Sequence, residues 1–193
     1  MDIRRYLKIV KEEEIARRYF VINSFDGALT ILGIVIAIYV SGERNPTPII
    51  ISSLGAAIAI AVSGMWGAYA IERAERQKSL RELERHLLSD LDETEIERKL
   101  NVTTILIAFV DGFSPLLVSL VTISPFIAAR LGMLGIETAF YFSLMLIALV
   151  LLLLGAMIGK IAKENVIKSG FSMLFAGVAV GILVYLLDLL KVL

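Results

Sequence analysis

The sequence predicts an all-α integral membrane protein with five transmembrane helices. Of its 193 residues, 58% are hydrophobic and the mean hydropathy is +0.81, which exceeds the values typical of soluble domains. The apolar residues gather in five segments, each near the ~20 residues that a membrane-crossing helix needs. The charged residues gather instead at the N-terminus and in one internal segment.

The N-terminal segment, residues 1–19, places apolar residues between basic and acidic ones at helical spacing. This pattern is typical of an amphipathic helix on the membrane surface that leads into the first span, or of a solvated charged helix. The connection 72–101 is long and strongly charged, and separates the first two spans (within 20–71) from the last three (within 102–193). The predicted spans are 20–41, 48–71, 102–128, 137–159 and 170–190.

The distribution of lysine and arginine predicts the orientation. Sixteen of the 19 lie in residues 1–19, in residues 72–101 or between spans four and five. Cytoplasmic loops are enriched in these residues. We therefore expect a multi-pass protein of the cell membrane with its N-terminus inside and its C-terminus outside.

Two short matches indicate an internal repeat. Residues 25–27 (Phe-Asp-Gly) are echoed by residues 110–112 (Val-Asp-Gly), and residues 64–67 by residues 156–159. Spans one and two would then correspond to spans three and four in the same orientation, with a fifth helix added. Parallel repeats of this kind occur in transporters, whose sites lie near the repeat interface.

An aspartate interrupts the first span. Burying an ionisable group at membrane depth costs about 2.5 kcal/mol or more on insertion scales. Asn23, Asp26 and Thr30 are spaced i, i+3, i+7, so a helix places all three on one face. This face either lines a polar pathway or is hydrogen-bonded to a neighbouring helix and holds the bundle together.

A second aspartate, Asp111, lies in the third span and is followed by Ser114 and Pro115. A proline inside a helix frees a backbone carbonyl, which a cation can use. Asp26 and Asp111 together predict a hard-oxygen site for a divalent cation, or a proton relay. The alternative is that Asp111 is a structural partner for hydroxyl groups on neighbouring helices.

The second span combines small residues with possible soft ligands. Met65 and Tyr69 lie near its predicted cytoplasmic end, and a thioether suits a late first-row metal at a transient site; the alternative for Met65 is simple packing. Small residues recur every four positions and predict close helix packing: Gly55, Ala59, Ser63 and Gly67. The same spacing recurs at Gly155 and Gly159 and at Gly177 and Gly181.

If the second span continues as a helix into the cytoplasm, Glu75, Glu82 and His86 share one stripe, next to Glu72. Two carboxylates and an imidazole can bind a divalent metal. The alternative is a solvated helix with i,i+4 ion pairs such as Glu72–Arg76.

The composition also excludes some classes of function. A net charge of zero gives no indication of nucleic-acid binding, and the absence of cysteine excludes disulfides and thiolate sites. No span carries a hydrolase or metalloprotease motif. We therefore expect a protein that is not an enzyme and has no prosthetic group.

Taken together, these residues resemble the vacuolar iron transporter family. The likeness rests on Asn23–Gly33, Ser63–Tyr69, Gly112–Pro125 and Lys168–Leu190. It implies five-helix protomers that form a homodimer and move Fe²⁺ or Mn²⁺ out of the cytosol in exchange for protons. The family's first-helix aspartate in the metal path matches Asp26, and its second-helix methionine matches Gly64 or Met65.

Together with the intramembrane acids, this resemblance implies an exporter of Fe²⁺ or Mn²⁺ with protons as the coupling ion. Asp26 is the expected intramembrane ligand, Asp111 a second ligand or the proton-coupled group, and the charged connection a collector of cations. The expected partners are the lipid bilayer, divalent metal ions and a second copy of the chain. The alternatives are a transporter of another substrate or of protons alone, and a membrane scaffold without transport activity.

Overall fold

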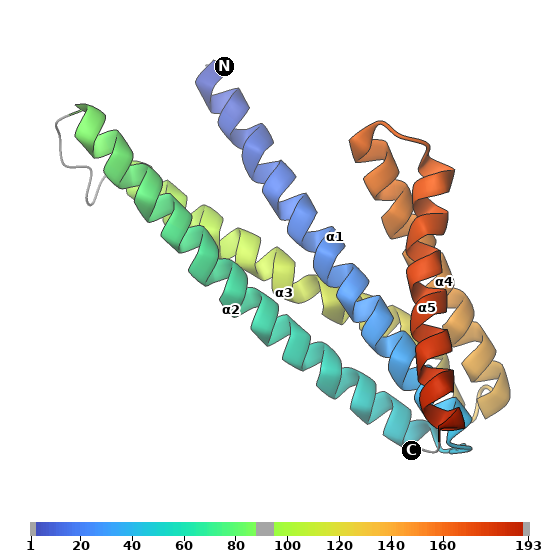
Figure 1. Cartoon of the computed structure of the whole chain (residues 1–193). Coiled ribbons are helices and arrows are strands. Elements are labelled where there is room, and N and C mark those ends of the chain that lie inside the picture. Colours follow the sequence, from blue (N-terminus) through green and yellow to red (C-terminus); the bar gives the residue numbers. More distant parts are fainter. Residues whose placement is uncertain (1–2, 88–94, 191–193) are drawn as a thin grey trace.

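The computed structural model describes residues 3–87 and 95–190, which form five helices. In chain order these are α1 (Ile3–Val40), α2 (Pro46–Leu87), α3 (Glu95–Arg130), α4 (Ile136–Ala162) and α5 (Val166–Leu189) (Figure 1). Each contains a stretch that is long and apolar enough to cross a membrane, and the described ranges contain no strand. The all-helical class and the presence of five helices able to cross a membrane are therefore confirmed.

The helices extend further than the predicted spans. α1 is one continuous helix from Ile3, so the N-terminal segment and the first span form a single rod (Figure 1). α2 continues to Leu87 because residues 68–87 contain neither glycine nor proline and are rich in alanine, glutamate, arginine and leucine, which favour helix. The described parts of the connection 72–101 are thus helical extensions of α2 and α3, and we call residues 72–87 of α2 with residues 95–101 of α3 the stalk.

α1 lies between two helix pairs (Figure 1). It packs against α2 and α3 on one side and against α4 and α5 on the other. The core lies where α1, α3 and α4 meet, and its largest fully buried side chains include Ile31, Val35, Ile123, Phe126 and Phe140. The helix that carries Asp26 is therefore held from both sides.

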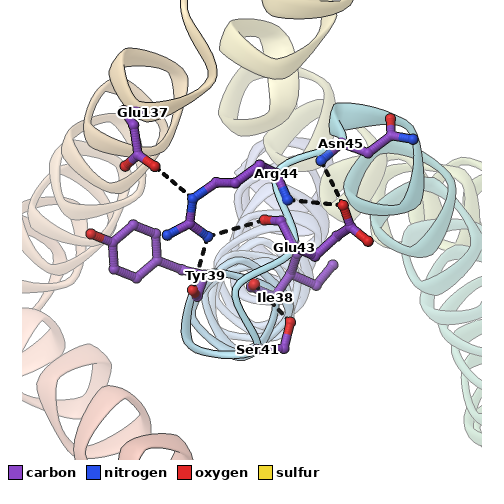
Figure 2. Close-up of polar contacts among 7 residues, drawn as sticks. All are labelled: Ile38, Tyr39, Ser41, Glu43, Arg44, Asn45 and Glu137. Atoms are coloured by element: carbon purple, nitrogen blue, oxygen red, sulfur yellow. Dashed lines mark hydrogen bonds and ion pairs between the residues drawn. The ribbon is translucent and has the colours of Figure 1, made fainter.

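The turn between α1 and α2 lies at the end of the bundle opposite the stalk (Figure 1), where it is bonded to α4 (Figure 2). The Arg44 guanidinium donates to the Glu137 carboxylate at 2.5 Å and to the Tyr39 main-chain oxygen at 3.1 Å. It also lies 4.9 Å from the centre of the Tyr39 ring, which packs edge-on against Phe140. This contact fixes the ends of three helices in register.

Glycines allow α4 and α5 to pack closely. A Cβ atom at Gly155 would lie 2.5 Å from the Ser169 main-chain oxygen, and one at Gly159 would lie 2.9 Å from the Val166 Cα atom. A Cβ atom at Gly177 would lie 2.7 Å from the Leu151 side chain. The packing role predicted for these glycines is confirmed.

The small residues of α2 behave differently. A Cβ atom at Gly55 or Gly67 would meet nothing within 4 Å, and Ala59 and Ser63 are exposed. This stripe packs against none of the described helices of its own chain. The predicted close packing at Gly55 and Gly67 is therefore not made with the described helices of the same protomer, and stays a prediction for a helix of a second copy.

Two Ser-Pro pairs adapt α3 to an apolar environment. Pro115 and Pro125 lie inside the helix and have no N–H group for the carbonyl four residues earlier. In both cases the preceding serine supplies the missing donor. The Ser114 hydroxyl donates to the Asp111 carbonyl at 2.8 Å, and the Ser124 hydroxyl donates to the Val121 carbonyl at 2.7 Å. Such hydroxyls satisfy carbonyls that would otherwise be unpaired away from water.

Candidate functional site

The conspicuous polar feature within the apolar part of the bundle is a groove of about 560 Å³ between α1 and α2. Asp26 is exposed in it, at the middle of a stretch able to cross a membrane. The predicted face of Asn23, Asp26 and Thr30 lines one wall, and Ser63 lies on the other. We call this the Asp26 groove. Its lining residues are Asn23, Asp26, Leu29, Thr30, Ala59, Ile60, Ser63 and Gly64.

Asn23 connects this groove to the second aspartate. Its side-chain nitrogen donates a hydrogen bond to a carboxylate oxygen of Asp111, which is only 2% exposed. Asp26 and Asp111 are close enough for their charges to interact. The structure therefore brings together the two acids that lie 85 positions apart in the sequence, with a neutral amide beside them.

Gly64 makes room for this arrangement. A Cβ atom at this position would lie 2.9 Å from a carboxylate oxygen of Asp111 and 3.3 Å from the Asn23 side-chain nitrogen. The absence of a side chain lets polar groups of α1 and α3 approach the α2 backbone. Three helices thus meet at one polar point.

Ser114 and Pro115 do not contribute to the groove as predicted. Ser114 is buried, is not among the residues that line the groove, and donates its hydroxyl to the Asp111 carbonyl. That carbonyl is the one that Pro115 frees, so it already has a donor. The prediction of Ser114 as a pathway-lining residue is therefore corrected: its hydroxyl satisfies the backbone.

Met65 and Tyr69 lie near the site but outside the groove. Met65 is 40% exposed and packs over Gly112, where a Cβ atom would lie 2.9 Å from the Met65 Cβ atom. Tyr69 lines a separate pocket of about 270 Å³ between α2 and α3, which also contains Arg73 and Arg76. The contact of Met65 supports the packing alternative, although the residue adjoins the turn of α3 that holds Asp111.

The acids of the stalk do not gather. Glu72 is 3% exposed, and one of its carboxylate oxygens lies 3.7 Å from the Arg76 Nε atom, as the ion-pair alternative predicts. Glu75 and Glu82 are exposed, and the His86 side chain lies outside the described side chains. Among the side chains that the structure describes, no three histidine, aspartate or glutamate residues form a group able to hold a metal ion.

Tyr19 lies next to this site, although it does not line the Asp26 groove and was not predicted from the sequence. It lies on α1 one turn before Asn23, and the charges of Glu72, Glu75 and Asp111 all act on its hydroxyl. Its spacing of four residues from Asn23 places both side chains on the same face of α1, and this spacing could have identified Tyr19 from the sequence. Tyr19 extends the polar line from the Asp26 groove towards the stalk.

Five membrane-length helices around buried and groove-lining polar groups define a multi-pass α-helical membrane protein. The chain belongs to the same family as the uncharacterized protein MJ0645 of the archaeon Methanocaldococcus jannaschii. The two are 34% identical over 178 residues, which cover 91% of this chain and 90% of the relative. No protein-family model matches the chain, and no solved structure matches it.

Proposed function

We propose that this protein exports a divalent transition metal, Fe²⁺ or Mn²⁺, across the cell membrane in exchange for protons. The observation that carries the proposal is Asp26, a carboxylate exposed in a groove at membrane depth. An ionised group in this position is costly unless a cation or a proton accompanies it. Intramembrane carboxylates of this kind mark ion pathways.

The groove has the oxygen ligands that a hard or borderline cation prefers. Asp26 supplies a carboxylate, and Asn23, Thr30 and Ser63 supply neutral amide and hydroxyl oxygens. Carboxylates and carbonyls suit Mn²⁺. Asp111 contributes a second carboxyl group next to Asn23 without being exposed itself.

A homodimer would complete this site. The Asp26 groove is open on the protomer surface, and the exposed small residues Gly55, Ala59 and Ser63 lie on the same helix. Small-residue stripes allow helices to approach closely in membranes. In a two-fold dimer the same face meets itself, so the two copies would cover the two grooves and add a second Asp26 to the site.

Exchange for protons follows from the same carboxylates. A site that binds a metal ion through ionised carboxylates releases protons on binding, and protons compete with the metal for the same oxygens. With the N-terminus and the stalk in the cytosol, as the lysines and arginines indicate, metal enters from that side. Acid on the opposite side then displaces the metal and accelerates net export.

The decisive experiment is the flux of Fe²⁺ and Mn²⁺ in proteoliposomes under an imposed pH gradient. We expect gradient-dependent flux in the wild type and its loss in Asp26→Asn, which keeps the size of the side chain but not its charge. Asp188→Asn is the matched control, because Asp188 lies in the last turn of α5 and does not line the Asp26 groove. Flux that survives in folded Asp26→Asn would overturn the proposal.

A membrane scaffold without transport activity is the second candidate. It is favoured by Asp111, which is buried and hydrogen-bonded like a structural group. The two candidates differ in their response to metal. A transporter that binds Fe²⁺ or Mn²⁺ in its folded state gains thermal stability from it by mass action, whereas a scaffold gains none. A stability gain with neither metal, but with another cation, would indicate a different substrate.

A further inference from the structure

A second groove lies between α1 and α4, at the end of the bundle where the stalk begins. Its volume is about 620 Å³, within the range of ligand-binding pockets. α1 and α4 meet near the opposite end and separate towards this one (Figure 1). The residues that line this α1–α4 groove are Glu14, Ile15, Arg17, Arg18, Val21, Ile22, Ile158, Ile161 and Ala162.

The lining combines an apolar floor with two cations. Ile22, Ile158 and Ile161 are all exposed there. Among the described residues, neither Arg17 nor Arg18 forms a salt bridge; Arg18 lies 5.6 Å from the centre of the Tyr19 ring. Glu14 supplies the only acid of the lining. The lining therefore has an excess of one positive charge over a hydrophobic surface.

The surroundings add to this charge. Lys160 lies in the last turn of α4, Lys163 caps that helix, and Lys168 lies in the first turns of α5. Glu164 is the only acid between them. The groove also lies at the ends of two membrane-length stretches, since Glu13–Val40 begins beside it and Ile136–Ala162 ends there. This is the depth at which the headgroups of a bilayer meet its acyl chains.

We propose that the α1–α4 groove binds one anionic membrane phospholipid. Arg17 and Arg18 hold its phosphodiester, since arginine offers paired donors that match phosphate oxygens. The isoleucines of α1 and α4 contact its acyl chains. A free phosphate ion would leave these isoleucines without a partner, and a second copy of the same patch would bring like charges together. This inference does not depend on metal transport.

The test uses the delipidated full-length protein in detergent. Binding is measured by native mass spectrometry and by the thermal midpoint with phosphatidylglycerol, phosphatidylethanolamine, phosphatidylcholine or inorganic phosphate. We expect phosphatidylglycerol alone to bind at one lipid per protomer and to raise the midpoint. An equal effect of either other lipid would overturn the requirement for an anionic lipid, and an equal effect of inorganic phosphate would overturn the lipid assignment.

Two variants locate the site. Arg17→Gln with Arg18→Gln should weaken phosphatidylglycerol binding about 25-fold, because each basic residue near an anionic headgroup contributes about fivefold. Arg81→Gln with Arg85→Gln, two exposed stalk arginines, makes the same charge change elsewhere and should leave binding unchanged.

Ala162→Trp keeps every charge but fills the groove, and should also abolish binding. It keeps the proposal testable if the double arginine variant fails to fold. Unchanged affinity in the folded double arginine variant, or in Ala162→Trp, would overturn the proposal.

Discussion

Asn23 of α1 donates a hydrogen bond to the buried carboxylate of Asp111 of α3, and Gly64 of α2 leaves the space in which they meet. This contact joins three helices at one polar point inside an apolar bundle. It also places the carboxyl group of Asp111 behind the Asp26 groove, where it is buried. The stability of the bundle and the chemistry of the groove are thus linked through Asn23.

Asn23→Ala should lower the free energy of unfolding by about 1–3 kcal/mol, because it leaves the buried Asp111 carboxylate without its donor. The measurement is denaturant unfolding in detergent, with Asn101→Ala, an exposed asparagine of α3, as the control. A double-mutant cycle with Asp111→Ala should give a coupling energy of about 0.5–3 kcal/mol. Strictly additive effects would contradict a direct interaction.

Gly64→Ala should destabilise the protein by about 1–3 kcal/mol, since the new methyl group would lie 2.9 Å from the Asp111 carboxylate and force it to move. Gly67→Ala is the matched control on the same helix. Nothing lies within 4 Å of its added methyl group, so the better helix propensity of alanine should leave stability unchanged or raise it by up to about 1 kcal/mol. Thermal midpoints of the two variants distinguish them, and equal shifts would refute the assigned role of Gly64.

Ser114→Ala should cost about 1–3 kcal/mol, because it removes the hydroxyl that donates to the Asp111 carbonyl, for which Pro115 has no N–H group. Adding Pro115→Ala should recover part of this loss, since alanine restores a backbone N–H group for the same carbonyl. Ser124→Ala removes the equivalent bond at an exposed position and should cost less. The order of the three unfolding midpoints checks the argument; a Ser124→Ala effect as large as that of Ser114→Ala would oppose it.

Ala59→Leu should dissociate the proposed homodimer without unfolding the protomer, because Ala59 is exposed on the small-residue stripe of α2. The protein mass in detergent, measured by light scattering, reports the change. Ser172→Leu, at an exposed position of α5, is the control and should leave the dimer intact. The opposite pattern would place the second copy on α5.

Much of the fold could be predicted from local pattern alone. The number of apolar runs that are long enough to cross a membrane predicts the number of spans. The helical spacing of Asn23, Asp26 and Thr30 predicts that they share one face, and all three line the same groove. The extension of α2 to Leu87 agrees with the absence of glycine and proline and the abundance of helix-forming residues after position 67.

The remaining features depend on contacts between helices distant in sequence. Ser114 is a polar residue of the type expected to line a pathway, yet its hydroxyl donates a hydrogen bond to the main-chain carbonyl three residues earlier. Gly64 and Gly67 are alike in sequence, but only the first faces Asp111. The sequence offered Glu72 as a metal ligand beside the stripe of Glu75, Glu82 and His86 or, as the interleaved arginines favour, as the ion-pair partner of Arg76. The structure shows the ion pair. Spacing gives the face on which a side chain lies, but not what lies opposite.

The length of α2 sets how far the stalk reaches from a membrane. With 42 residues the helix is about 63 Å long, whereas a bilayer with its headgroups is about 40–45 Å thick. With Pro46 at one face and the helix upright, Leu87 stands about 20 Å beyond the other face. That distance is more than twice the Debye length of about 8 Å at physiological salt. Ions near the tip of the stalk therefore come from bulk solution and are not enriched by the charge of the lipid surface.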